Sequence, residues 1–471
     1  MRICIITFII APYVVLLAGC ALVAPPEATR SIPPPASTDS RRPNSSRPRR
    51  ARASSAPREP WKLEDCIRVA LERNPGLEAS EWDVQSAASS ATIARAAAMP
   101  QLSADGGYTS HVNKQPLTSV GGGGGRVVAT RDIAEGHLRL HMPLYTGGRI
   151  RSEIAAAELA EVAAGGTFAR NRRELIYDVS RTYYDILARR RVVKALEGSR
   201  DALEAHLEQV ESMIANERAT TVDRLRTEVR LADIRQELAT ARNDLETRRY
   251  ALATIMGMDE VDDPPRVTGE LTFNDLPQSD PPDVVDTAYQ QREDYRSLRA
   301  KVGAQKQKVA AARAEPWPTV NLEASYGDRR DTSDMSSSEN VGSAGIGVSL
   351  PLFEGGRIRA EVRRQQAELR AIRQRLRELE HRIRLEVRTA LNNVSSARER
   401  VEATDEAIEQ AEESLRTERL RYRNGKASTT DVLDAQADLL DAEKNHHGAL
   451  AAWNTARTEL RLTTGQERQE P

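Results

Sequence analysis

Two aspartates near the C-terminus are the residues of this sequence whose type and spacing most clearly allow chemistry. Asp431 and Asp434 lie three positions apart, just after a turn at Gly425, in a segment whose pattern predicts the start of a helix. At this spacing both carboxylates lie on one face of the helix. Their chemistry is electrostatic: Asp431 can cap the helix N-terminus, or the pair can present two negative charges together. Both uses stay open at this point.

Residue types that serve enzymes and metal sites occur without the partners that they need. His446 and His447 have no acidic or cysteine residue at a ligand spacing, which favours a helix-surface position. No glycine run is followed by the Lys-Ser or Lys-Thr of a phosphate-binding loop, and no serine elbow is present. Cys66 is expected to be a small buried apolar residue. We therefore expect no enzyme activity, no metal and no cofactor.

A reactive thiol, Cys20, lies at the end of an N-terminal leader. A basic residue precedes an apolar run, residues 3–17, which is short for a membrane span and typical of a secretory signal. Leu17-Ala-Gly-Cys20 resembles the lipobox of bacterial lipoproteins. This resemblance implies that residues 1–19 are removed and that Cys20 carries lipid, and Ala21 in place of Asp favours the outer membrane. The alternative is ordinary cleavage nearby, with Cys20 incidental.

Composition changes behind the leader. Residues 20–60 are rich in Pro, Ser and Arg and have almost no periodic apolar residues, which predicts a disordered tether. Aromatic residues make up only 4% and charged residues 29% of the 471 residues, a balance typical of long helices and coiled coils. The net charge of −1 provides no large field for binding nucleic acid.

The rest of the chain is a tandem repeat. The segment from His141 to Arg151 has a closely similar second copy that ends at Arg359. Pro351 in the second copy follows Pro143 in the first by 208 positions. The same offset relates Asp223 to Asp431. The predicted organisation is repeat one over 61–258, a linker over 259–281, repeat two over 282–465 and a tail over 466–471.

Each repeat is predicted to carry a strand hairpin between long helices. The hairpins span about 101–144 and 319–352, and the first contains the loop Gly121–Gly125, whose role is open. Pro351 cannot donate a ladder hydrogen bond, so it is expected to end its strand, and Gly355-Gly356 then lets the backbone turn into the helix. The predicted junction residues are Pro143, Gly147, Gly148, Pro351, Gly355 and Gly356.

Heptad spacing predicts coiled-coil packing behind the second junction. Apolar residues recur every seven positions from Val362 to Ile383 and again from Val387 to Leu415. About 65 helical residues at about 1.5 Å each make a rod of roughly 100 Å. Such a length suits a structure that crosses a compartment rather than a globular domain.

The hairpin segments alternate in the way that membrane β-strands do. Ile346, Val348 and Leu350 share one face, and aromatic residues such as Trp317 and Tyr326 lie near segment ends. The alternative is a soluble sheet of two hairpins. Four strands cannot close a conducting barrel, so a membrane role requires several chains.

Together these features resemble the TolC family of outer-membrane efflux channels, over about 400 residues. The resemblance is carried by the duplicated unit, by the Pro-Leu-Phe-Glu-Gly-Gly-Arg junction and by the motif from Tyr422 through Gly425 and Asp431 to Asp434. It implies a mainly α fold with a membrane β portion. Three chains would join four strands each in a twelve-stranded β-barrel, and their coiled-coil helices would form an α-barrel.

The resemblance also implies a function. The homotrimer would lie in the outer membrane, anchored by lipid and extending into the periplasm, and would be the passive exit duct of a tripartite efflux system for small molecules. Its partners would be a periplasmic adaptor and an inner-membrane pump of the RND or ABC type. The alternatives are a type I protein-secretion outlet and a lipid-tethered periplasmic coiled-coil scaffold without a pore.

Finally, the resemblance assigns a gate at the periplasmic tip. Asp431 and Asp434 would line the narrowest point, where six carboxylates from three chains attract cations and raise one another's pKa. Tyr422 and a basic side chain would hold the tip closed by bonding toward Asp223. The family's arginine position is Ala427 here, so Lys426 or Arg423 would replace it.

Overall fold

The computed structural model describes residues 60–117, 128–258, 264–274, 281–331 and 338–466. The leader, Cys20, the tether, the Gly121–Gly125 loop and most of the tail lie outside the described residues.

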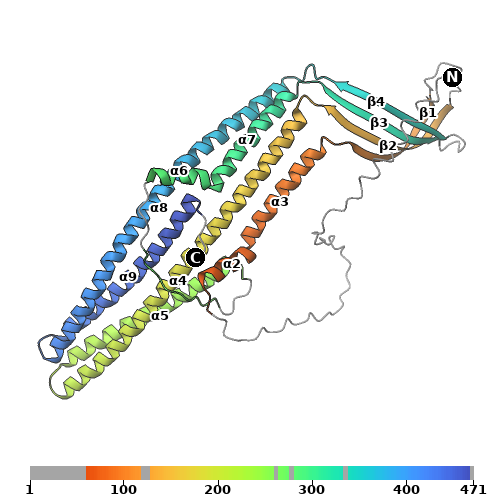
Figure 1. Ribbon diagram of the computed structural model, residues 1–471. Helices are drawn as coiled ribbons and strands as arrows, with labels where there is room; N and C mark the ends of the chain where they lie inside the picture. The colour runs from red at the N-terminus through yellow and green to blue at the C-terminus, as the bar shows by residue number, and fades with distance from the viewer. Residues whose placement is uncertain (1–59, 118–127, 259–263, 275–280, 332–337, 467–471) are drawn as a thin grey trace, which may run out of the picture. The chain divides into compact units, whose positions relative to one another are not determined.

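Two similar sets of elements follow one another along the chain (Figure 1). Each set consists of two short or medium helices, a strand hairpin, one very long helix and one returning helix. The first set is α2 Leu63–Arg73, α3 Pro75–Ala96, β1 Gln101–Leu117, β2 Val128–Tyr145, α4 Arg149–Ala215 and α5 Thr221–Ile255. The second set is α6 Pro281–Gln291, α7 Glu293–Ala314, β3 Thr319–Asp331, β4 Ser338–Ser349, α8 Arg357–Arg423 and α9 Thr429–Thr464.

The strands form one antiparallel sheet in the order β1-β2-β3-β4. The centre of the sheet joins the two repeats, because β2 pairs with β3, and His141 lies opposite Glu323. Strand β4 stops before Pro351, as predicted. Pro143, by contrast, lies inside its strand, because β2 continues to Tyr145, close to the predicted end of the first hairpin. The ladder shifts register between Pro143 and Tyr145, which accommodates the missing donor of the proline.

The two faces of the sheet differ in character. Along β2, Glu135, His137, Arg139 and His141 alternate with residues that share the other face. On that other face the cross-strand pairs are apolar, including Leu138 with Tyr326, Met142 with Leu322, and Leu322 with Ile346. The side chains of Leu138, Tyr326 and Ile346 are all exposed. One chain therefore presents an open sheet with one polar and one apolar face.

The long helices α4 and α8 have 67 residues each, which corresponds to a length of roughly 100 Å. Helix α5 returns along α4, and α9 returns along α8 (Figure 1). The predicted heptad residues Ile383, Val387 and Val401 are buried between helices. Val362 is only half-buried. Within the described residues, no helix combines the length and the apolar character that crossing a membrane requires.

A helix break in each repeat was partly visible in the sequence. The predicted interruption at Asn74-Pro75 is confirmed, since Asn74 ends α2 and its side chain caps α3 by accepting from the Leu77 amide. The corresponding break between α6 and α7 lies at Arg292, which is only 2% exposed.

Candidate functional site

The candidate site is formed by the two helix turns at the ends of α4 and α8, called here the first tip (residues 216–220) and the second tip (residues 424–428). Tyr422 lies in the last turn of α8, and Asp431 in the first turn of α9. Asp223 lies in the first turn of α5.

Asp223 and Asp431 both close a capping box, in which an aspartate and a hydroxyl residue bond one another's backbone amides. Asp223 accepts from the Thr220 amide over 2.9 Å, and Asp431 accepts from the Ser428 amide over 2.7 Å. Bonds from the Thr220 side chain lower the pKa of Asp223, and bonds from the Ser428 backbone and hydroxyl lower the pKa of Asp431. Both carboxylates are therefore ionised at neutral pH, and the capping alternative is confirmed for Asp431 within one chain.

Asp434 lies one turn after Asp431, and both side chains are exposed. Their shared exposed face leaves the two carboxylates available to a further surface. Capping does not compete with such a role, because the Ser428 amide and hydroxyl both donate to the same oxygen of Asp431.

Tyr422 is 6% exposed and lies in an apolar cluster that joins α4, α8 and α9. Its hydroxyl lies 3.3 Å from the hydroxyl of Thr429, within its own repeat. A side-chain hydrogen bond with Thr429 also contributes to lowering the pKa of Asp223. Thr429, which is 2% exposed, therefore lies between Tyr422 and Asp223, the two residues that the sequence reasoning paired directly.

A second contact links the tips. The guanidinium of Arg226, on α5, donates to the hydroxyl of Thr430, on α9, over 2.8 Å. Among the described residues, neither Lys426 nor Arg423 forms an ion pair, so the basic partner predicted for Tyr422 is not identified by a contact. Sequence reasoning missed Thr429, Thr430 and Arg226, although all three lie within four residues of a capping box in the sequence.

The strand–helix junctions agree closely in the two repeats. Gly147 and Gly355 have φ of 61° and 59°, and Gly148 and Gly356 have φ of 88° and 87°. These left-handed conformations favour glycine, because a Cβ there crowds the carbonyl oxygen. The surroundings differ: a Cβ on Gly147 would lie 2.5 Å from the Cβ of Trp317, whereas Gly355 has open space.

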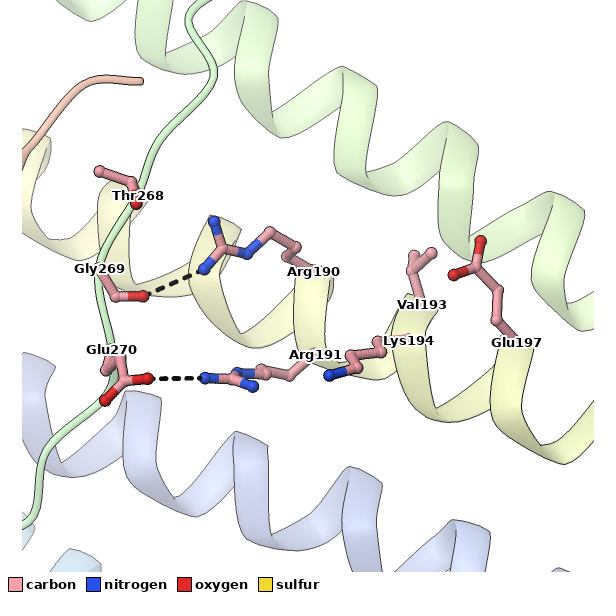
Figure 2. Close-up of a pocket in the computed structure, with 8 residues that line it drawn as sticks. All are labelled: Arg190, Arg191, Val193, Lys194, Glu197, Thr268, Gly269 and Glu270. Atoms are coloured by element: carbon pink, nitrogen blue, oxygen red, sulfur yellow. Dashed lines mark hydrogen bonds and ion pairs between the residues drawn. The ribbon is translucent and has the colours of Figure 1, made fainter. Parts of the chain in front are cut away.

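A cavity of about 550 Å³ lies between α4 and the chain segment that joins the repeats (Figure 2). Arg190 donates to the carbonyls of Val267 and Gly269 over 2.8 and 3.1 Å, and Arg191 lies 3.5 Å from Glu270. These bonds fasten the joining segment to α4.

The adjacent histidines lie between helices rather than on the surface. His446 is half-buried, with Nδ1 3.3 Å from the Thr404 hydroxyl, so the predicted surface position is wrong. Burial lowers the pKa of the neighbouring His447 to about 4. In the described part of the chain, no group of three or more His, Cys, Asp and Glu side chains is placed to hold a metal ion.

This duplicated unit of a strand hairpin and paired long helices is the architecture of solved outer-membrane channel proteins. The outer membrane protein VceC of Vibrio cholerae aligns with a TM-score of 0.74 and 20% identity over 86% of this chain and 96% of that chain. The CmeC outer membrane channel of Campylobacter jejuni aligns with a TM-score of 0.76 and 16% identity over 86% of this chain and 85% of that chain.

The family is defined by sequence. The chain belongs to the outer membrane efflux protein family, which it matches over residues 66–258 and 284–466, one match to each repeat. It is 24% identical to the outer membrane efflux protein BepC of Brucella suis over 64% of this chain and 63% of BepC. It is 24% identical to the cobalt-zinc-cadmium resistance protein CzcC of Cupriavidus metallidurans over 46% of this chain and 50% of CzcC. These matches span less than two thirds of the length of either relative.

Proposed function

We propose that this protein is the outer-membrane exit duct of a tripartite efflux system and assembles as a homotrimer. The supporting observation is the open four-stranded sheet, because its edge strands β1 and β4 have no partner within the described part of the chain. Backbone groups in a membrane must be paired, so strands span membranes only in a closed barrel. Four strands from each of three chains would give the twelve-stranded barrel of TolC-family channels.

The faces of the sheet support the same arrangement. The apolar face with Leu138, Tyr326 and Ile346 suits contact with lipid, and the polar face with Glu135 and Arg139 suits a water-filled lumen. Exposed apolar residues on the outer face of a sheet are costly in water but favourable in a bilayer. The long helices would then continue the channel through the periplasm as an α-barrel.

The anchor is part of the proposal. Cys20 is the acylated first residue of the mature chain, and residues 20–60 form the tether. A single lipid site adds to a barrel that already spans the membrane, so Cys20→Ala is expected to leave channel formation intact. Mass analysis of the mature N-terminus tests the assignment, and an unmodified start at another residue would overturn it.

The duct works with a periplasmic adaptor and an inner-membrane RND or ABC pump, and the pump supplies the energy. The cargo class is small toxic molecules or ions, in line with relatives named for multidrug resistance and for cobalt, zinc and cadmium resistance. The protein is not an enzyme, as membership of a channel family implies. A type I protein-secretion outlet remains the second candidate, since it shares the fold.

The tip is the gate of this duct. Tyr422, Asp223 and a basic side chain, Lys426 or Arg423, hold it closed, with Thr429 between Tyr422 and Asp223. Asp431 and Asp434 of three chains form the carboxylate ring at the aperture.

Cross-linking in mild detergent tests the assembly. Amine-reactive reagents are expected to give a ladder that ends at three chains, in the wild type and in Tyr422→Phe alike, because the tip does not form the barrel. A monodisperse monomer that inserts into membranes would contradict the proposal. A pore-free trimer would instead favour the lipid-tethered scaffold.

A further inference from the structure

His206 is a buried histidine that joins α4 to α8 near the two tips and that the proposed gate does not use. It lies on α4, in the first repeat, and is 9% exposed. Its ring lies 5.2 Å from the ring of Tyr422, on α8 of the second repeat. Its Nε2 atom is buried and has no hydrogen-bond partner among the described residues. A buried polar atom without a partner is rare in native proteins and calls for an explanation.

The charged groups that act on His206 come from two other helices. Burial lowers the pKa of His206, the charge of Arg419 on α8 lowers it further, and the charge of Asp223 on α5 raises it. Arg419 is held in place by Gln436 of α9, to which it donates over 2.6 Å. The side chains of α9 that pack in the Tyr422 cluster, Val432 and Ala435, carry no charge. The site therefore accommodates a neutral ring and disfavours a charged one.

We propose that His206 is a positioning residue that holds the two tips together in its neutral form and releases Tyr422 when it takes up a proton. The tips then separate, because the imidazolium is repelled by Arg419 and has no bonding partner for Nε2 in the buried site. The separation of the tips does not depend on the proposed function. Only the further step, that separated tips open the duct, rests on it.

The sign of the pH dependence follows from linkage. The separated state exposes His206 and binds more protons than the packed state, so the packed state gains stability as pH rises and loses it as pH falls. With a pKa of about 6.5 for the exposed ring and a lower pKa for the buried one, the ratio of separated to packed tips rises from pH 7.5 to pH 5.5, by at most about tenfold.

Distances between a spin label on the first tip and one on α8, before the second tip, test the proposal. Labels are placed at Arg218→Cys in the first tip and Arg416→Cys near the end of α8, both exposed positions. Cys66 is fully buried, and burial raises the pKa of its thiol to about 12, so it stays protonated and unreactive. The chain without added cysteines gives the background. Labelled chains are diluted with unlabelled protein so that each assembly carries one labelled pair.

Three variants separate protonation from packing. His206→Phe keeps a ring against Tyr422 and cannot be protonated, so its tips are expected to stay packed at both pH values. His206→Lys carries a charge at both pH values, and its tips are expected to be separated at both. His447→Gln removes a half-buried histidine outside the tips and is expected to retain the wild-type response.

An unchanged wild-type distance distribution between pH 7.5 and pH 5.5 would overturn the proposal, as would a full pH response in His206→Phe. The distances report the region of the tips and not the sheet. Failure of this proposal can be told apart from failure of the channel proposal, because the spin-label distances do not depend on conductance. A protein that does not conduct can still be tested for the separation of its tips.

Discussion

Asn74 in the first repeat and Arg292 in the second donate, with different side chains, to backbone carbonyls at equivalent positions of the two repeats. The Asn74 amide donates to the carbonyl of Ile255 over 2.8 Å, and the Arg292 guanidinium donates to the carbonyl of Thr463 over 3.3 Å. Ile255 and Thr463 are 208 positions apart, so both bonds tie a helix break to the end of the returning helix. Arg292 additionally pairs with Asp294 and with Glu386 on α8.

We predict that Arg292→Ala destabilises the protein more than Asn74→Ala. Removal of Arg292 leaves Asp294 and Glu386 without their buried cation, which costs about 3–5 kcal/mol. Removal of Asn74 loses a cap and one bond to a carbonyl, which costs about 1–2 kcal/mol. Thermal unfolding followed by circular dichroism in detergent measures both. Arg416→Ala, at an exposed ion pair, is the control, and equal losses in all three variants would contradict the prediction.

The same cluster predicts a dependence on acid. Burial raises the pKa of Asp294, but the bonds and charge of Arg292 outweigh it and hold the pKa below the usual 3.8. The pair therefore stabilises the fold above about pH 4, and this stabilisation is lost as pH falls through the lowered pKa. In Arg292→Ala, burial raises the pKa of Asp294 against only the charge of Arg170 and the Tyr295 amide bond. The stabilisation that acid removes in the wild type is then absent, so the melting temperature is expected to fall less steeply as pH decreases. Identical profiles of melting temperature against pH in the two proteins would rule this out.

The fold was largely predictable because the sequence contains it twice. The offset of 208 positions and the glycine pairs at Gly147 and Gly355 predicted the junctions, and the heptads predicted the long helices. The position of Pro143 inside β2 was not predictable, because the sequence does not reveal which strand pairs with β2. Its neighbour β3 comes from the other repeat and tolerates the register shift beside Pro143.

The tip was predictable only in part. The capping of α9 by Asp431 follows from local spacing, because a capping box lies within four residues. The contacts of Tyr422 with Thr429 and His206, and of Arg226 with Thr430, depend on how α4, α5, α8 and α9 are packed side by side. His206 and Tyr422 are 216 positions apart, so neither helical periodicity nor the repeat offset of 208 brings them together.

The two junctions predict unequal effects for the same substitution. Gly355→Ala has open space and is expected to cost about 1–2 kcal/mol for the left-handed backbone alone. Gly147→Ala meets the same backbone cost and also the Cβ of Trp317, so it is expected to be the more destabilising of the two. The melting temperatures of the two variants give the comparison, and a larger loss in Gly355→Ala would contradict it.

The aspartate pair predicts a change in ion selectivity. Asp431→Asn with Asp434→Asn removes both charges but keeps an oxygen that can accept the Ser428 amide bond. Cation selectivity, and block by multivalent cations, are expected to fall in planar bilayers while the trimer persists. Asp83→Asn with Asp201→Asn removes the same charge from exposed positions on α3 and α4 and is the control. Unchanged selectivity in the tip variant would show that Asp431 only caps α9 and that Asp434 has no role in ion selectivity.

Single-channel recording in planar lipid bilayers tests the central claim, that three copies of this chain form a conducting duct gated at the tip. The purified wild-type protein is expected to give small current steps of uniform size. Tyr422→Phe with Asp223→Ala is expected to give larger steps, because the closed tip loses its contacts. Absence of current from both proteins, when both have inserted as trimers, would contradict the account.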